Sequence, residues 1–227
     1  MKLSLIIPIF NEAELIETVL ENVRAALPFD HELILVDDHS TDGTTDILKR
    51  EAQNSDAVVI YHDKNKGKGA AIRTGLAHAS GDIIIIQDAD LEYDPRDIPR
   101  VIAPILEGRA NVAYGSRFRG TVKKMALPNY IANKILAGLV TILYFHRITD
   151  EATAYKAFRR EVIQAIDLKC NRFEFCPEVT AKVLRRGERI IEVPVTFTAR
   201  TVQEGKKIGW RDFLLALWTL LKYRLVK

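Results

Sequence analysis

Apolar residues in the first half of the chain fall into short continuous runs separated by amphipathic segments. Runs such as the four isoleucines at 83–86 are typical of strands that are covered on both faces of a sheet. The predicted strands are residues 3–9, 33–36, 57–61, 82–86 and 112–114. Helices are predicted after Asn11, through Ile47 and Leu48, over residues 67–79 and from Pro95. Repeated strand–helix units predict an α/β fold, with a mostly parallel sheet flanked by helices on both sides.

The second half of the chain is dominated by two long apolar segments, residues 128–145 and 210–226. Both are predicted helices, and the second is amphipathic. The other predicted elements are strands at 155–158 and 189–195, a helix at 177–186 and a basic, glycine-containing loop at 200–207. Because no repeat, low-complexity segment or linker divides the sequence, we predict one domain over residues 1–227.

Two helix starts carry recognisable capping signals. Asn11 is followed three residues later by Glu14, which predicts a capping box at the first helix. Pro95 follows Asp94, and proline is well placed at the first position of a helix.

Composition narrows the class of partners. With 48% apolar residues, 28% charged residues and a net charge of +3, the chain resembles an ordinary globular protein. The basic residues form no long run, so no nucleic-acid partner is expected. Cys170 and Cys176 lack the spacing of a zinc pair and are interpreted as reduced thiols.

Membrane-crossing segments are not expected. The longest apolar, uncharged runs are residues 135–145 and 213–221, and a spanning helix needs about 20 residues. No secretory signal precedes the first strand, so we expect a cytoplasmic chain that can lie on a membrane surface.

The strongest chemical signal is the pair Asp88 and Asp90, which follows the isoleucine run directly. Ligands in parallel sheets bind outside the carboxyl ends of strands, where these two carboxylates fall. Hard oxygen ligands suit Mg²⁺ or Mn²⁺, held by one or two carboxylates together with substrate phosphates. The small Ala89 between them lets a ligand approach closely. The alternative is a solvated acidic turn.

A second acidic cluster, VDDHSTDG at 36–43, follows another predicted strand. Asp38 can accept hydrogen bonds from a nucleobase or ribose, whereas Asp42 is interpreted as a turn residue that caps the next helix. Asn11 and Glu12 follow the first strand, so three strands direct polar groups to one edge.

These motifs together resemble a known enzyme family. The segments PIFNE at 8–12, VDDHSTDG at 36–43, NKGKG at 65–69 and DAD at 88–90 occur in the order seen in family-2 glycosyltransferases with the GT-A fold, a Rossmann-like mixed sheet. The segments GSRF at 115–118, DEATAYKAF at 150–158 and EVPV at 192–195 are similar to the branch that makes dolichyl-phosphate mannose or glucose. The resemblance covers nearly the whole chain.

The resemblance implies a role for individual positions. Residues 1–120 would bind the nucleotide sugar, and residues 121–227 the acceptor. The residues implied in holding the nucleoside are Pro8, Phe10, Glu12, Val36 and Asp38. Those implied at the metal and donor diphosphate are Asp88, Ala89, Asp90 and Glu92. Arg117 would contact phosphate in the active centre, and Arg200 and Lys206 belong to a basic loop that closes on the donor pyrophosphate.

Asp150 stands where related inverting enzymes place a catalytic carboxylate. A general base is needed only if the nucleophile carries a proton, and a phosphate acceptor is already anionic. Asp150 could therefore act as a base, position the acceptor or a basic partner, or cap a turn. Ala154 stands where the branch usually has glycine, and the long form of the branch carries membrane helices beyond the point where this sequence ends.

The leading hypothesis is an inverting, metal-dependent transferase that moves mannose or glucose from GDP- or UDP-sugar to a polyprenyl phosphate. The alternatives are a transferase with a soluble glycan or protein acceptor, a sugar-phosphate nucleotidyltransferase and a non-catalytic binding subunit. The nucleotidyltransferase is disfavoured because residues 8–12 contain no glycine. Lys68 is interpreted as facing solvent or phosphate, and residues 171–173 as packing groups. The apolar helices could meet a membrane, pack on the sheet or join two copies of the chain.

Overall fold

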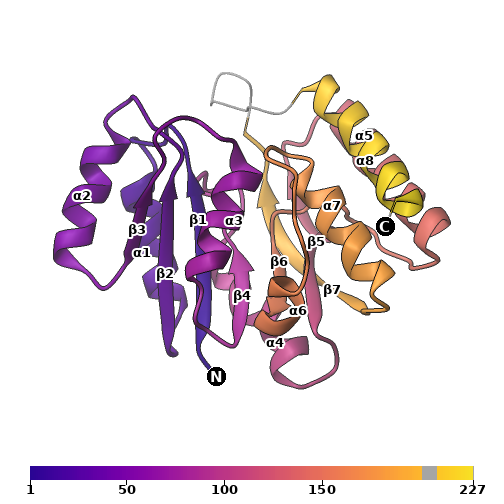
Figure 1. Ribbon diagram of the computed structural model, residues 1–227, viewed down its shortest axis with the longest axis horizontal. Coiled ribbons are helices and arrows are strands. Elements are labelled where there is room, and N and C mark those ends of the chain that lie inside the picture. The colour runs from indigo at the N-terminus through magenta and orange to yellow at the C-terminus, as the bar shows by residue number, and fades with distance from the viewer. Residues whose placement is uncertain (201–208, 227) are drawn as a thin grey trace.

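A computed structural model describes residues 1–200 and 209–226, and in these residues seven strands form one mixed sheet (Figure 1). The strands are β1 Leu3–Ile9, β2 His31–Asp37, β3 Val58–Tyr61, β4 Ile83–Ile86, β5 Val112–Lys123, β6 Lys156–Arg159 and β7 Ile190–Thr198. Their spatial order is β3-β2-β1-β4-β6-β5-β7. β6 runs antiparallel to both of its neighbours, and every other pair is parallel. The predicted mostly parallel mixed sheet is confirmed.

Helices cover both faces of this sheet (Figure 1). They are α1 Ile16–Ala26, α2 Thr44–Asn54, α3 Lys68–His78, the 3₁₀ turn η1 Pro95–Asp97, α4 Ile98–Leu106, α5 Leu127–Tyr144, α6 Arg160–Gln164, α7 Phe175–Arg185 and α8 Trp210–Leu225. Buried side chains of α1, α2 and α4 form a core on one face, and those of α3, α5, α6, α7 and α8 form a core on the other.

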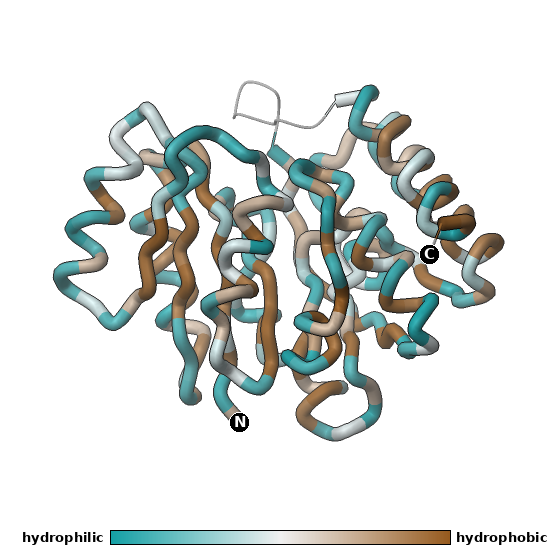
Figure 2. Tube along the Cα trace, viewed as in Figure 1, coloured by the Kyte–Doolittle hydropathy of each residue, from teal (hydrophilic) through white to brown (hydrophobic). Residues whose placement is uncertain are grey.

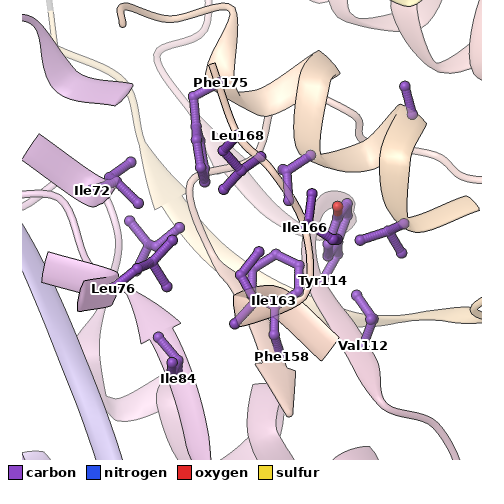
Figure 3. Packing of buried hydrophobic residues seen from close by; sticks show 14 of the residues in the cluster. Ile72, Leu76, Ile84, Val112, Tyr114, Phe158, Ile163, Ile166, Leu168 and Phe175 are labelled. Atoms are coloured by element: carbon purple, nitrogen blue, oxygen red, sulfur yellow. The ribbon is translucent and has the colours of Figure 1, made fainter. Parts of the chain in front are cut away.

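The central strand β4 shows why a continuous apolar run is needed. Ile84 and Ile86 join the core beneath α3 and α7, whereas Ile83 and Ile85 join the core beneath α1 and α4. Successive side chains of a strand point to opposite faces, so a strand covered on both sides has no polar position. Figure 3 shows Ile84 facing Leu76 of α3, with Phe158 of β6 beside them.

The structure differs from the sequence-based expectations at three local features. The capping box at Asn11 is wrong: α1 begins at Ile16, and Asn11 has a φ of 52° while its side chain accepts a hydrogen bond from the Thr41 amide at 2.8 Å. β5 is far longer than the predicted 112–114, because its second half also pairs with β7. The short helix α6 was not predicted, since five residues are too few to show a helical period.

The carboxyl ends of β1, β2 and β4 lie at one edge of the sheet, as parallel pairing requires. α5 and α8 pack against each other, and the Tyr144 hydroxyl donates to the Leu220 carbonyl at 2.6 Å. Figure 2 shows apolar positions in the central strands and again along α5 and α8. Of the helices in the described ranges, none has the length and apolarity to cross a bilayer.

Candidate active site

A cavity of about 360 Å³ opens at the carboxyl ends of β1, β2 and β4. It brings together most of the residues expected to bind nucleotide and metal: Pro8, Phe10, Glu12, Asp38, Asp88, Ala89, Asp90, Glu92 and Arg200. Val36 is different, because it is fully buried in the core beneath α3 and supports the cavity without lining it. Lys206 lies outside the described residues.

Sequence reasoning missed part of this lining. Asn65, Gly67 and Lys68 line the cavity from one side, and Arg172 and Phe173 line it from another. The NKGKG motif was a visible signal for the first group. No signal distinguished residues 172–173 from packing residues, since their position depends on a contact with α3.

The glycines of the NKGKG motif allow that contact. A Cβ on Gly67 would lie 2.4 Å from the Asn171 carbonyl oxygen, and one on Gly69 would lie 2.5 Å from the Cys170 carbonyl. The Asn171 carbonyl also accepts a hydrogen bond from the Ala70 amide at 3.0 Å. Residues 170–173, from the second half of the chain, therefore pack closely against the start of α3.

The Asp38 carboxylate is held by three donors. Oδ1 accepts from the Lys66 amide at 2.8 Å and lies 2.7 Å from His62 Nδ1, while Oδ2 accepts from the Gly67 amide at 2.7 Å. The other nitrogen of His62 lies 2.9 Å from Thr74 Oγ1. A carboxylate offers about four acceptor positions, so one remains for a ligand N–H. Asp38 thus shapes the cavity wall and still presents an acceptor to it.

Asp88 and Asp90 are each paired with a cation of the protein. Lys68 Nζ lies 2.6 Å from Asp88 Oδ1 and 2.8 Å from Oδ2. Arg200 Nη2 lies 3.1 Å from Asp90 Oδ2, and its two terminal nitrogens reach Glu12 at 3.1 and 3.4 Å. Negative charge still accumulates here: burial and the neighbouring Asp88 and Glu92 raise the pKa of Asp90 to about 7, against the opposing effect of Arg200.

This donor set fits a divalent metal only in part. Within residues 1–200 and 209–226 no three acidic, histidine or cysteine side chains are gathered into a ready-made metal site. Two carboxylates at a cavity wall are what Mg²⁺ or Mn²⁺ requires when substrate phosphates complete the coordination. The residues therefore fit a metal that binds together with a diphosphate.

Arg117 and Asp150 form a buried pair beside the first cavity. Arg117 Nε and Nη2 each donate to an oxygen of Asp150 at 2.7 Å, and the Arg117 amide donates to it at 2.9 Å. Asp150 is fully buried. Burial lowers the pKa of Arg117, but the adjacent Asp150 carboxylate outweighs it and raises that pKa overall. Both oxygens of Asp150 are therefore occupied in holding Arg117.

Glu192 fixes the backbone that carries Asp150. Its carboxylate accepts from the amides of Thr149 and Asp150 at 2.8 and 2.9 Å, and from the Thr149 hydroxyl at 2.9 Å. This explains the acidic position in the EVPV segment of β7, which the resemblance alone did not.

A second cavity, of about 680 Å³, begins at Arg117 and runs between α5 and α8. Its walls are mainly apolar, and they include Leu127, Ile131, Leu136, Trp210 and Phe213. Four residues line both cavities: Lys68, Asp88, Glu92 and Phe173. The two spaces therefore meet at Asp88.

A GT-A sheet with paired carboxylates at the carboxyl end of β4 defines the class of the protein as a glycosyltransferase. Solved structures of glucosyl-3-phosphoglycerate synthase from Mycobacterium tuberculosis share this fold. One, in complex with Mn²⁺, UDP and phosphoglyceric acid, has a TM-score of 0.76 and 21% identity over 100% of this chain and 79% of that one. Another, with Mn²⁺, UDP-glucose and phosphoglyceric acid, has a TM-score of 0.74 and 20% identity over 99% and 78%.

The chain belongs to glycosyl transferase family 2, whose model matches residues 4–167. A dolichol-phosphate mannosyltransferase from Pyrococcus furiosus is 31% identical over 98% of this chain. This chain spans 64% of that relative's length. The predicted family is confirmed by the family model, and the predicted resemblance to the dolichyl-phosphate branch agrees with the similarity to this relative.

Proposed function

We propose that this glycosyltransferase moves a hexose, mannose or glucose, from a GDP- or UDP-sugar to a polyprenyl phosphate, with inversion at the anomeric carbon. The observation that carries the proposal is the meeting of a polar, carboxylate-lined cavity with an apolar one at Asp88 and Lys68. A donor with a diphosphate suits the first cavity, and an acceptor with a long hydrocarbon tail suits the second.

The donor end is supported by the chemistry of the first cavity. The remaining acceptor position of Asp38 suits a base N–H, which uracil and guanine both offer. Asp88 and Asp90 would hold Mg²⁺ or Mn²⁺, with Glu92 beside them, and the bound metal would neutralise the departing diphosphate. Structural relatives bound to Mn²⁺ and UDP support this assignment of the cavity.

The acceptor end is supported by Arg117. Its guanidinium is fixed by Asp150 and by the Asn133 side-chain oxygen at 3.1 Å, in the wall of the apolar cavity. Because Nε and Nη2 are held by Asp150 and Asn133, the two N–H groups of Nη1 are the ones that would donate to a phosphate. The phosphate oxygen would attack the anomeric carbon while the bond from that carbon to the donor diphosphate breaks. Asp150 positions Arg117 in this scheme, and no proton has to be removed.

A peripheral position on the cytoplasmic face of a membrane belongs to the same proposal. Along α8, Leu214, Trp218, Leu221 and Leu225 are exposed on one face, while Ala216, Leu220 and Tyr223 are buried on the other. Tyr223 packs inward and does not belong to the exposed face of α8. Along α5, Leu127, Ile131 and Ile135 are exposed beside the mouth of the second cavity.

The test is a transfer assay with radiolabelled GDP-mannose, GDP-glucose, UDP-glucose and UDP-mannose, and with a prenyl phosphate in detergent. We expect one donor to label the lipid, in the presence of Mg²⁺ or Mn²⁺. Phosphoglyceric acid is the informative second acceptor, since the structural relatives were solved with it. Labelling of phosphoglyceric acid or of a glycan, with none of the lipid, would replace the polyprenyl acceptor with a soluble one.

A further inference from the structure

The meeting point of the two cavities contains a cation to which the proposed function gives no role. Of the four residues that line both cavities, Lys68 carries the positive charge, and the others are Asp88, Glu92 and Phe173. In the proposed reaction this is the place where the donor diphosphate leaves and the acceptor arrives. A charged group at this point must therefore interact with the donor diphosphate, with the acceptor phosphate or with both.

The backbone of Lys68 is fixed, but its side chain has room to move. Lys68 is the first residue of α3, and the glycines on either side pack against residues 170–172. Four methylene groups separate this anchored backbone from the ammonium, which lies 5.9 Å from the centre of the Phe173 ring. The side chain is 20% exposed and lines both cavities, so the ammonium has open space on its cavity side.

The ammonium now occupies both oxygens of Asp88, at 2.6 and 2.8 Å. These oxygens are the ones that a divalent metal would use. A metal that binds Asp88 therefore competes with Lys68 for the same two oxygens, and it adds positive charge next to the ammonium. The competition is relieved when a diphosphate is present, because phosphate oxygens give the ammonium a new partner.

We propose that Lys68 couples metal binding to donor binding, by holding Asp88 first and moving to the donor phosphate when metal and nucleotide enter together. The proposal rests on the proposed function, since it needs a nucleoside diphosphate in the first cavity. Coupling of this kind is reciprocal: the metal tightens nucleotide binding by the same factor by which the nucleotide tightens metal binding. The metal therefore binds weakly when no nucleotide is present, and the site does not fill with metal before the donor arrives.

The experiment is a titration of the whole chain with Mn²⁺. Binding is measured by calorimetry and by the electron paramagnetic resonance signal of unbound Mn²⁺. Each titration is made alone and with saturating UDP or GDP. The variants are Lys68→Met, which keeps the length of the side chain, and Lys68→Arg, which keeps its charge. Lys66→Met is the matched control, because Lys66 pairs with Asp63 and the substitution causes the same loss of charge two residues away.

In the unsubstituted chain and in Lys66→Met, we expect nucleotide to tighten Mn²⁺ binding by about 5- to 150-fold, the usual range for coupled sites. In Lys68→Met, Mn²⁺ alone should bind about tenfold more tightly, and nucleotide should tighten Mn²⁺ binding by about tenfold less than in the unsubstituted chain, because the phosphate ligands of the metal remain. Lys68→Arg should restore the coupling. Equal coupling in Lys68→Met and Lys66→Met would overturn the proposal for Lys68. A chain that binds neither UDP nor GDP would instead overturn the proposed function.

Discussion

Each acidic side chain at the first cavity has a defined partner, and the partner indicates what the side chain can do. Asp38 is surrounded by donors and acts as a fixed acceptor, whereas Asp88 and Asp90 are paired with Lys68 and Arg200. Asp150, which the sequence left open between a base and a positioning group, has both oxygens committed to Arg117. Roles that look equivalent in sequence are thus separated by their neighbours.

The metal assignment is tested by Asp90→Asn. The substitution removes one metal-ligand charge, and we expect transfer to fall by about 100-fold or more, as for other groups that stabilise developing charge. Asp90 is half-buried and next to other carboxylates, so its loss should leave the melting temperature near that of the unsubstituted chain. Asp46→Asn, an exposed position on α2, is the control for charge. Near-normal turnover of Asp90→Asn with Mg²⁺ or Mn²⁺ would contradict the assignment.

His62 is tested through Asp38. Replacing His62 by Phe removes one of the three donors to that carboxylate and leaves Thr74 without its ring partner. Losing a buried hydrogen bond to a charged group lowers the free energy of unfolding by about 1.5 to 3 kcal/mol, and UDP or GDP should bind more weakly because Asp38 is held by one donor fewer. His78→Phe, at the exposed end of α3, should bind nucleotide normally. Calorimetry of both variants decides whether His62 positions Asp38 for the ligand.

At the scale of elements, Glu32 ties the start of β2 to two other segments. Its carboxylate accepts hydrogen bonds from Lys2, just before β1, from Ser4 in β1 and from Ser80 in the turn before β4. Burial raises the pKa of Glu32, but these hydrogen bonds outweigh it and lower that pKa from 4.5 to about 2. The amino ends of the three central strands are thereby fixed by one charge.

The contribution of Glu32 should depend on pH. Because its folded-state pKa is lowered, the stabilisation is present above pH 4.5 and is lost as the pH falls towards 2. We expect Glu32→Gln to lower the free energy of unfolding by about 1 to 2 kcal/mol at pH 7, after allowance for solvent screening. Urea unfolding at pH 7 and pH 3 should show this difference shrinking, while exposed Glu21→Gln shows little at either pH. A difference that is unchanged at pH 3 would contradict the linkage.

How far the sequence predicted these elements depended on the range of the interactions involved. β4 was predictable because its burial on both faces leaves an unbroken apolar run, and β1 because Ser4 is the one polar residue among its seven. The insertion of β6 between β4 and β5 was not, since antiparallel pairing over more than 40 residues leaves no local pattern. In the same way, DAD at 88–90 identified the cavity, but nothing in the sequence linked Lys68 to Asp88 or Arg117 to Asp150.

At the scale of the molecule, α5 and α8 together present a face of exposed apolar side chains. Trp218 is 63% exposed and Leu225 is 83% exposed, and the basic Lys222 and Arg224 lie on the same helix. Apolar residues flanked by basic ones are suited to the surface of an anionic membrane. Lys227 lies outside the described residues.

Flotation with anionic phospholipid vesicles tests this surface. The chain should float with the vesicles, and replacing Leu214, Trp218 and Leu221 by Ser should reduce flotation and transfer to a long-chain prenyl phosphate together. Leu106→Ser is the control, because Leu106 is a comparably exposed leucine on α4, which covers the opposite face of the sheet. A chain that remains with the soluble fraction, and elutes as a dimer that the same substitutions dissociate, would show that the face joins two copies.

The close fit of Gly67 and Gly69 against residues 170–172 limits how such enzymes can be recombined. A chimera that joins the first half of one family member to the second half of another places two unrelated surfaces in a contact that tolerates no added carbon atom. Arg200 imposes a similar constraint, because it reaches back to Glu12 and Asp90. The proposed acceptor preference is therefore more readily exchanged by grafting α5 and α8, which line the second cavity, than by cutting the chain near its midpoint.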